Sequence, residues 1–318
     1  MDLPIQVRSL DLMIKLLRHD LANIPSYGFR LQRGTQADGL KSSALPRSTP
    51  EAEGLGSSSL ERIYRELDSR QLSVAPHALM ILINGKVVSE GYWAPYRAEY
   101  PYMLYSMSKS ITGTAIGIAI EEGLLSLDES LADIFPEFMP TNYLRQHKVV
   151  TVRQLLTMRT GNRFNEVGSM LDENWVKMFM ESLPKFDPGT AFEYNSMNTY
   201  MLAAILVKKT GVPLMEYLRP RLFAPLGIEE VAWEVCPQGV EKGGWGLYLR
   251  LEDAAKLGQL YLQNGVWDGK RIVSEDWVHA ATQSKATPLR ATQAAATATR
   301  FGPKATAPTN LTGRLGSM

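Results

Sequence analysis

The sequence predicts a mixed α and β fold for this 318-residue chain, and three features point to it. Two strand-like runs are joined by an Asn-Gly pair, a strong short-range signal of a β-hairpin. Helical patterns lie on both sides of this hairpin and dominate the chain after it. Apolar residues make up 45% of the chain, so it can bury a large core in one domain or two lobes.

The N-terminal part, residues 1–45, is expected to form an amphipathic helix followed by a linker. The helix falls within Met1–Asn23, where charged residues interrupt any secretory signal. It would dock on the body of the protein or on a partner. Its apolar residues recur at helical spacing: Val7, Leu10, Ile14 and Leu17. From about Gln32 to Gly56 the chain is rich in Gly, Ser, Pro and Thr, which predicts a surface linker.

A helix should begin after this linker and lead into the hairpin. Ser58 and Glu61 have the spacing of a capping box. One apolar stripe follows them: Leu60, Ile63, Tyr64 and Leu67. The hairpin strands are predicted over Ala78–Ile83 and Val87–Tyr92, with Asn84-Gly85 as the turn.

The next helix is predicted from Ser106 to Gly123 and is small or apolar nearly all round. A helix of this composition belongs in the interior, with close neighbours on most sides. Gly123 suits its C-terminal cap. A side chain at the head of such a helix would be held rigidly.

From Leu127 to about Ala281 the pattern is mainly helical, without an internal repeat. A short helix is predicted over Thr151–Met158, and Asp187-Pro188-Gly189 is a turn. Further helices are predicted over Asn198–Lys209, Leu214–Phe223, Leu251–Asn264 and Ser274–Ala281.

The amino-acid composition of the last segment differs from that of the rest of the chain. After Lys285 no acidic residue occurs, and 15 of the 33 residues from Ala286 to Met318 are Ala or Thr. Such a composition buries little apolar surface. We therefore expect a body over residues 46–284 and a disordered tail over residues 285–318.

Composition narrows the function classes. A net charge of +1 gives no reason to propose nucleic acid or an anionic membrane as a partner. The single cysteine, Cys236, rules out an internal disulfide, which fits a reducing, cytoplasmic environment, and we expect it to be a core or loop residue. The four histidines form no metal motif. No stretch approaches the roughly 20 apolar residues of a membrane span.

Ser106 and Lys109 carry the first chemical signal, in the pattern Ser106-Met107-Ser108-Lys109. Three residues apart on a helix, their side chains share one face. A serine hydroxyl needs a base to act as a nucleophile at neutral pH. A lysine can be that base when burial lowers its pKa. The same spacing at Ser182-Leu183-Pro184-Lys185 is a decoy, because Pro184 opposes a helix.

Tyr194 is a candidate for a second proton-handling group. It lies 88 residues after Ser106, behind a Pro-Gly turn and just before a predicted helix. A phenol there could relay a proton between the serine and a leaving group. Tyrosines more often pack by their rings, so this candidate depends on the rest of the pattern.

Five segments together carry a family resemblance: Ser106–Lys109, Leu155–Gly161, Phe192–Ser196, Pro225–Ile228 and Gly243–Gly246. They resemble the serine β-lactamase and penicillin-binding protein superfamily. The most similar branch is the class C-like one, the β-lactamase-related serine hydrolases, which includes D-aminopeptidases, esterases and 6-aminohexanoate-dimer hydrolases. The resemblance covers roughly residues 46–283.

This resemblance implies a β-lactamase/transpeptidase-like α/β fold, with an antiparallel sheet flanked by helices, an all-helical region and the site between them. It implies Ser106 as the acylated nucleophile, Lys109 as the base and Tyr194 as the proton relay. The backbone N–H of Ser106 would be one oxyanion donor. No cofactor or metal is implied. Expected substrate contacts are Tyr105, Ser196 and Trp245. Core packing is the alternative for Tyr105, Trp175, Phe192 and Trp245.

Two departures from the family pattern stand out. The family's Tyr-x-Asn is Tyr194-Asn195-Ser196 here, which favours an esterase, amidase or peptidase over a strict β-lactamase. The family's third motif, Lys-Thr-Gly or His-x-Gly, should lie beyond Met318, and Leu311-Thr312-Gly313 lacks its basic residue. We therefore expect only the two hairpin strands of the sheet, and a truncated or frame-shifted copy whose tail from about Pro288 is foreign to the fold.

Three functions stay open. The first is a serine hydrolase that cleaves an amide or ester bond of a small-molecule substrate through an acyl-enzyme on Ser106. The second is a catalytically silent relative, either a binding protein or a non-functional remnant. The missing third motif favours it, whereas intact Ser106, Lys109 and Tyr194 oppose it. In the third, the Ser-x-x-Lys pattern is accidental in a helical scaffold. The substrate and the oligomeric state stay undetermined.

Overall fold

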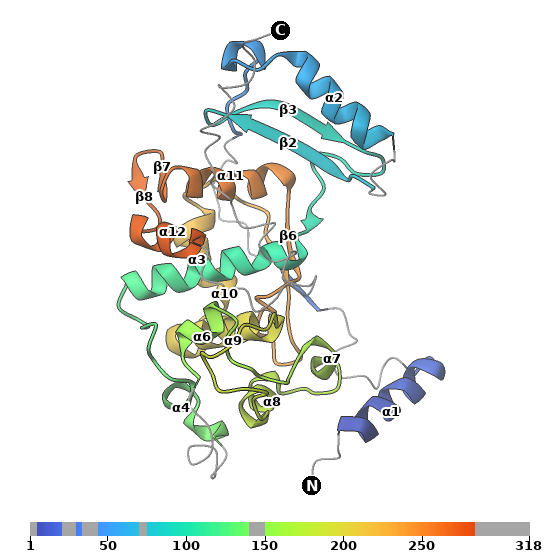
Figure 1. The fold of residues 1–318 in the computed structure, drawn as a ribbon, viewed down its shortest axis with the longest axis vertical. Coiled ribbons are helices and arrows are strands. Elements are labelled where there is room, and N and C mark those ends of the chain that lie inside the picture. Colours follow the sequence, from blue (N-terminus) through green and yellow to red (C-terminus); the bar gives the residue numbers. More distant parts are fainter. Residues whose placement is uncertain (1–4, 21–29, 34–43, 70–74, 140–149, 284–318) are drawn as a thin grey trace.

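Helix α3 (Ser108–Glu121) runs through the middle of the molecule, with other elements above and below it (Figure 1). The computed structural model describes residues 5–20, 30–33, 44–69, 75–139 and 150–283. Within α3 the run Thr114–Ala119 is buried without a break, so neighbours surround the helix as its composition predicts. The chain enters it through a 3-10 turn, η3 (Tyr105–Met107).

The upper part in Figure 1 consists of a β-hairpin with helix α2 (Ser57–Asp68) over one face and α11 (Leu251–Leu262) below it. Strands β2 (Ala78–Ile83) and β3 (Lys86–Tyr92) pair in antiparallel register. Both turn residues have positive φ, 52° at Asn84 and 77° at Gly85, as the Asn-Gly pair predicts.

The capping box predicted at Ser58 and Glu61 is wrong. Helix α2 begins at Ser57, and its N-cap is Gly56, two residues before Ser58, without a side-chain hydrogen bond. The Ser57 backbone N–H donates instead to Glu51 at 3.0 Å. The acidic partner therefore comes from η2 (Glu51–Glu53), before the helix, and Ser58 lies inside the first turn.

A four-stranded antiparallel sheet, in the order β1-β5-β6-β4, joins segments that are far apart in the sequence. Its strands are β1 (Leu31–Arg33), β5 (Ala232–Glu234), β6 (Leu247–Leu249) and β4 (Tyr102–Met103). The expectation that only the hairpin strands remain is therefore wrong. Strands of two or three residues are too short to show a period of two in sequence.

The lower part of Figure 1 is helical. It contains α4 (Leu131–Ile134), η4 (Pro136–Phe138), α6 (Val152–Leu156), α7 (Glu166–Ser169), α8 (Trp175–Glu181) and α9 (Ser196–Thr210). The predicted cap at Thr151 is confirmed as a capping box with Gln154. Helix α9 begins two residues before its predicted start, because Asn195 caps it, and it ends at Gly211 with φ of 75°.

The predicted helix over Leu214–Phe223 is divided into two. Helix α10 (Leu214–Leu218) is followed by a π-helical turn, η5 (Arg219–Phe223), that contains Pro220. Proline has no N–H to give to an α-helical ladder, which explains the change. The chain then forms β5, β6 and α11, the small hairpin β7 (Val266–Trp267) with β8 (Lys270–Arg271), and α12 (Glu275–Thr282).

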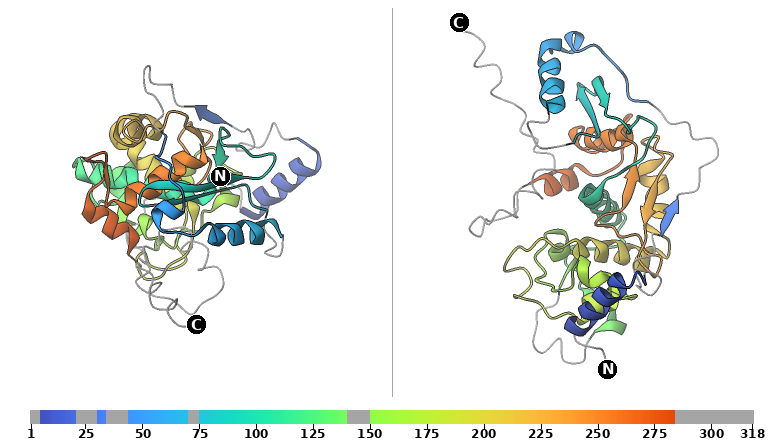
Figure 2. Two further views of the ribbon diagram at one scale, coloured as in Figure 1. Left: turned by 90° about the horizontal axis from the view of Figure 1, so that it is seen from above. Right: turned by 90° about the vertical axis from the view of Figure 1, so that its right-hand side faces the viewer.

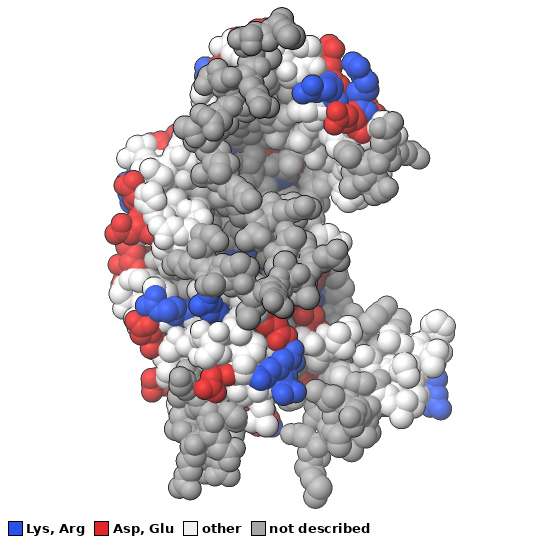
Figure 3. All heavy atoms as spheres, in the orientation of Figure 1, with Lys and Arg blue, Asp and Glu red and all other residues white. Residues whose placement is uncertain are grey.

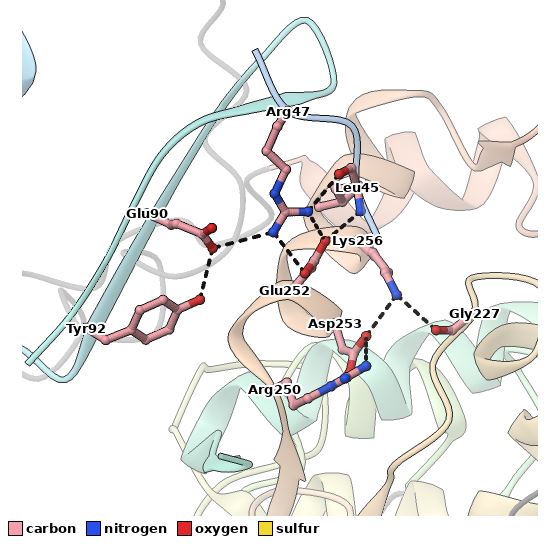
Figure 4. Close-up of polar contacts among 9 residues, drawn as sticks. All are labelled: Leu45, Arg47, Glu90, Tyr92, Gly227, Arg250, Glu252, Asp253 and Lys256. Carbon is pink, nitrogen blue, oxygen red and sulfur yellow. Dashed lines mark hydrogen bonds and ion pairs between the residues drawn. The ribbon is translucent and has the colours of Figure 1, made fainter. Parts of the chain in front are cut away.

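Within the described residues 44–56, the segment predicted as a linker contacts the body of the protein at Leu45 and Arg47. Leu45 is only 5% exposed, and its backbone N–H donates to Glu252 on α11 at 2.6 Å. Arg47 extends between Glu90 of β3 and Glu252 (Figure 4). The contacts with Glu252 join residues about 200 positions apart, and the Gly, Ser and Pro content of the segment does not indicate them.

Helix α1 (Ile5–Leu17) confirms the predicted N-terminal helix (Figures 1 and 2). Cys236 is fully buried beside the Tyr200 hydroxyl, at 3.5 Å, and is thus a core residue. The tail expected over residues 285–318 and Leu311-Thr312-Gly313 lie outside the described residues.

The described part of the face in Figure 3 carries acidic and basic side chains close together. Within the described residues, no helix combines the length and the apolar character needed to cross a membrane.

Candidate active site

Ser106 lies exposed on the turn between β4 and α3. The turn is fixed from both sides: Leu104 donates its N–H to Leu247 of β6 at 2.8 Å, and the Ser108 hydroxyl donates to the Tyr105 carbonyl at 2.6 Å. Tyr105 has φ of 44°, an uncommon conformation for a residue with a side chain. The surrounding structure thus holds the serine in one place.

Lys109 points toward Ser106 from the first turn of α3. Its Nζ lies 3.1 Å from the Ser106 Oγ, 3.0 Å from the Ser196 Oγ and 2.7 Å from the Gly244 carbonyl oxygen. The three partners come from three separate parts of the chain. They fix the amine in a single position beside the serine hydroxyl.

Burial is the main influence on the Lys109 amine, and it lowers the pKa of that amine below its ordinary value of 10.5. The Tyr194 hydroxyl and the Glu166 carboxylate act in the opposite direction. A lowered pKa increases the fraction of neutral amine near neutral pH. Only the neutral form can accept a proton.

Tyr194 completes a contiguous group with these two residues. Its hydroxyl shares a hydrogen bond of 2.8 Å with the Ser106 Oγ, and its ring centre is 5.0 Å from the Lys109 Nζ. Tyr194 is 37% exposed, so solvent can reach the hydroxyl groups of Tyr194 and Ser106. The Ser106 Oγ therefore lies between an amine and a phenol, each within hydrogen-bond distance.

Asn195 holds this group to the rest of the site, a role that the sequence reasoning missed. Its side chain accepts from the Met197 N–H at 2.9 Å and so caps α9. The same amide donates to the carbonyls of Asn162 at 3.1 Å and Phe164 at 2.7 Å. Asn195 is buried, and asparagine is a residue type that favours helix N-caps, but nothing near it in the sequence indicates the two loop contacts.

Gly243 and Gly244 form the third side of the site. The Gly243 carbonyl accepts from the Thr112 hydroxyl of α3 at 2.9 Å, and the Gly244 carbonyl accepts from Lys109. A Cβ on Gly244 would lie 2.8 Å from the Ser196 carbonyl oxygen. Glycine is thus required where this loop touches both helices. In the sequence this pair contributes only to the family resemblance, and its close contacts become known from the structure.

Ser196 and Glu166 lie on the α9 side of Lys109. The Ser196 hydroxyl contacts Lys109, whereas its backbone N–H donates to the Glu166 carboxylate at 3.3 Å. Glu166 is exposed at the start of α7. The sequence reasoning did not single out Glu166, because an exposed glutamate carries no local signal of a role.

Tyr105 and Trp245 differ in how they border the site. Tyr105 is 68% exposed beside Ser106, so its ring is free to meet a substrate. The Trp245 ring instead stacks on Trp175, with ring centres 5.9 Å apart, and Trp175 is 1% exposed. Core packing thus accounts for Trp175 and for one face of Trp245.

The decoy serine and lysine do not meet in a comparable group. Ser182 ends α8, and Lys185 pairs with Glu193 at the surface. Among the residues that the structure describes, no three His, Cys, Asp or Glu side chains are grouped to hold a metal ion.

Comparison with known proteins gives a family match over most of the chain. The family described as Beta-lactamase matches residues 61–308. The 6-aminohexanoate-dimer hydrolase of Paenarthrobacter ureafaciens is 28% identical over 234 residues, which are 67% of this chain and 58% of that protein. Protein flp of Staphylococcus aureus strain MW2 is 25% identical over 192 residues, 53% of this chain and 37% of flp. The chain thus spans less than two thirds of the length of these curated relatives.

Solved structures share the fold. A penicillin-binding protein homologue from Caulobacter crescentus superposes with a TM-score of 0.59 at 18% identity, over 77% of this chain and 78% of that one. The octameric penicillin-binding protein homologue from Pyrococcus abyssi gives 0.57 at 22% identity, over 72% and 60% of the two chains. EstCE1, a hydrolase with promiscuous acyltransferase activity, gives 0.54 at 17% identity, over 74% and 79%. The α/β fold expected from the sequence, of the β-lactamase/transpeptidase type, is confirmed.

Proposed function

The chain belongs to the Beta-lactamase family, and from this premise we propose that it is a serine hydrolase that cleaves an amide or ester bond through an acyl-enzyme on Ser106. One observation carries the proposal. The Ser106 Oγ lies 3.1 Å from a partly buried amine, Lys109, and 2.8 Å from a phenol, Tyr194. A nucleophile held between two groups that transfer protons is the arrangement that covalent hydrolysis requires.

Acylation follows from these positions. The neutral Lys109 amine accepts the Ser106 hydroxyl proton while Oγ forms a bond to the substrate carbonyl carbon. The Ser106 backbone N–H donates to the oxyanion that develops. The intermediate collapses when the Tyr194 hydroxyl protonates the leaving nitrogen or oxygen. The Lys109 ammonium then returns its proton to Tyr194, with which it interacts.

Deacylation reverses the proton transfers. A water molecule attacks the ester carbonyl and loses a proton to Lys109 by way of the Tyr194 hydroxyl. Lys109 then gives that proton to the Ser106 Oγ as the acid product leaves. The enzyme regains its starting protonation state, and the net change is the addition of one water to the bond that was cleaved.

The substrate is proposed to be a small amide or ester. The named relatives include a 6-aminohexanoate-dimer hydrolase, and the fold neighbours include a hydrolase with acyltransferase activity. Ser196 presents a hydroxyl at the third residue of the Tyr194 motif, and exposed Tyr105 borders the nucleophile. We propose that both contact the substrate, with Trp245 at the edge of the site.

The test is intact mass spectrometry after treatment with a serine-reactive phosphonate. We expect one adduct per chain in the wild-type protein and none in Ser106→Ala. Ser182→Ala, which alters the decoy pair, is the matched control and should label fully. Labelling that persists in Ser106→Ala would remove Ser106 as the nucleophile.

The same experiment separates the proposal from its rival, a catalytically silent relative. A folded wild-type chain that forms no adduct would contradict the proposed function and support the silent relative. Labelling followed by screening of matched ester, D-amino-acid amide and β-lactam substrates would then rank the substrate classes.

A further inference from the structure

Glu166 is the described acidic residue whose charge acts on the Lys109 amine. The connection is short and passes through Ser196. One Glu166 carboxylate oxygen accepts the Ser196 backbone N–H at 3.3 Å, and the Ser196 hydroxyl lies 3.0 Å from the Lys109 Nζ. The carboxylate also lies at the N-terminus of the 15-residue helix α9, where a negative charge is favoured.

The exposed position of Glu166 sets it apart from the structural carboxylates of this protein. Glu241 and Asp253 are fully buried and hold backbone N–H groups or cations. Within the described part of the chain, Glu166 takes part in none of the Lys or Arg ion pairs. An exposed carboxylate with one backbone contact gives little stability, so its placement beside the catalytic group calls for another explanation.

We propose that Glu166 is a positioning residue of this site. It anchors the Ser196 backbone and stabilises the protonated form of Lys109 through its negative charge. The inference rests on the proposed function, in which Lys109 is the base. The carboxylate stabilises the ammonium that forms when Lys109 takes the Ser106 proton. It therefore makes the neutral amine a stronger base at the moment of attack.

The other groups around Lys109 come from the elements packed against it. Tyr194 brings a phenol from the segment before α9, α9 brings the Ser196 hydroxyl, and the loop before β6 brings the Gly244 carbonyl. Lys242, two residues before Gly244, is paired with Glu234. Among the described groups that act on the Lys109 amine, Tyr194 contributes a phenol and Glu166 contributes the carboxylate.

The test compares Glu166→Gln with the wild-type protein in the pH dependence of the Ser106 phosphonylation rate. Removing the negative charge destabilises the Lys109 ammonium, so its pKa falls and the midpoint of the rate profile moves to lower pH. Because Glu166 is exposed, we expect a shift of about half to one pH unit. The plateau at high pH should be lower, since a weaker base drives the attack less well. High salt should reduce the difference in midpoint.

Two further variants distinguish this role from a merely structural one. Glu166→Asp keeps the charge and should keep the midpoint near that of the wild-type protein. Glu173→Gln removes an exposed carboxylate seven positions further along the chain and should leave the profile unchanged. An unchanged midpoint in Glu166→Gln, or an equal shift in Glu173→Gln, would overturn the proposal.

A second readout does not depend on activity. The chain labelled with ¹³C at the lysine ε-carbon is titrated by NMR, and the Lys109 signal is assigned from its loss in Lys109→Ala. A lower Lys109 midpoint in Glu166→Gln supports the inference even if Ser106 proves unreactive. An unchanged midpoint with reactive Ser106 refutes the inference and leaves the proposed function standing.

Discussion

Lys109 shows how much of the chemistry depends on hydrogen-bond direction at one residue. Its amine faces two hydroxyls and one carbonyl, and a carbonyl can only accept. One N–H is therefore committed to Gly244 in both protonation states. The charged amine can donate to all three partners, whereas the neutral amine must accept from one of the two hydroxyls. Since Ser106 is one of these, the geometry permits its proton to move to Lys109.

The phenol group of Tyr194 can be tested at this scale. Tyr194→Phe keeps the ring and removes the hydroxyl that lies 2.8 Å from the Ser106 Oγ. We expect kcat/KM for an activated ester to fall about 10²- to 10⁴-fold, the usual size of a lost proton-transfer group. The free energy of unfolding should barely change. Tyr100→Phe, another exposed tyrosine, is the control and should retain activity. Undiminished kcat/KM in Tyr194→Phe would exclude the phenol from the mechanism.

Among the elements, α3 carries the nucleophile turn and depends on close contacts along its length. Gly117 is buried, and a Cβ there would lie 2.5 Å from the ring of Trp277 on α12. Gly113, one turn earlier, has no heavy atom within 4 Å of a Cβ position. Packing against Trp277 thus requires a glycine at position 117, whereas no contact requires one at position 113. Each glycine weakens an isolated helix.

This contrast predicts opposite effects of one substitution. Gly117→Ala should lower the free energy of unfolding by about 1–3 kcal/mol, because the methyl group displaces Trp277. Gly113→Ala should raise it by up to about 1 kcal/mol, because alanine is the better helix former. Urea denaturation measures both. A stabilising Gly117→Ala would show that α12 does not pack against α3 as the structure places it.

At the scale of the whole molecule, two ion-pair groups on α11 connect distant parts of the chain (Figure 4). Arg47 connects the N-terminal segment to Glu252 and Glu90 at the surface. Lys256, 1% exposed, joins buried Asp253 to the carbonyl of Gly227, each at 2.9 Å. The first group is partly solvated, whereas the second is desolvated, so removal of a cation should have unequal effects.

Lys256→Met should lower the free energy of unfolding by about 3 kcal/mol, because Asp253 keeps its buried charge with Arg250 as its remaining cation. Arg47→Met should lower it by no more than about 1 kcal/mol. Chemical denaturation of the two variants at the same pH measures the difference. Equal losses would contradict the distinction between a buried and an exposed pair.

The features that could be predicted from the amino-acid sequence alone are those that depend on neighbours within a few residues. The Asn84-Gly85 turn, the Thr151 cap, the buried character of α3 and the spacing of Ser106 and Lys109 all follow from local backbone and side-chain preferences. The family resemblance added the fold, which the solved neighbours confirm. The roles of Ser106, Lys109 and Tyr194 stay predictions until the labelling experiment tests them.

Contacts between groups that are far apart in the sequence become known only from the folded structure. Tyr194 lies 88 residues from Ser106, and Gly244 lies 135 residues from Lys109, so no local preference places them together. The strands of the β1-β5-β6-β4 sheet are too short to show a periodic pattern, and packing rather than propensity forms them. The contact of Glu166 with Ser196, 30 residues further along the chain, is likewise known only from the structure. Contacts between remote segments come from burial of the shared core, and composition read along the chain does not encode their partners.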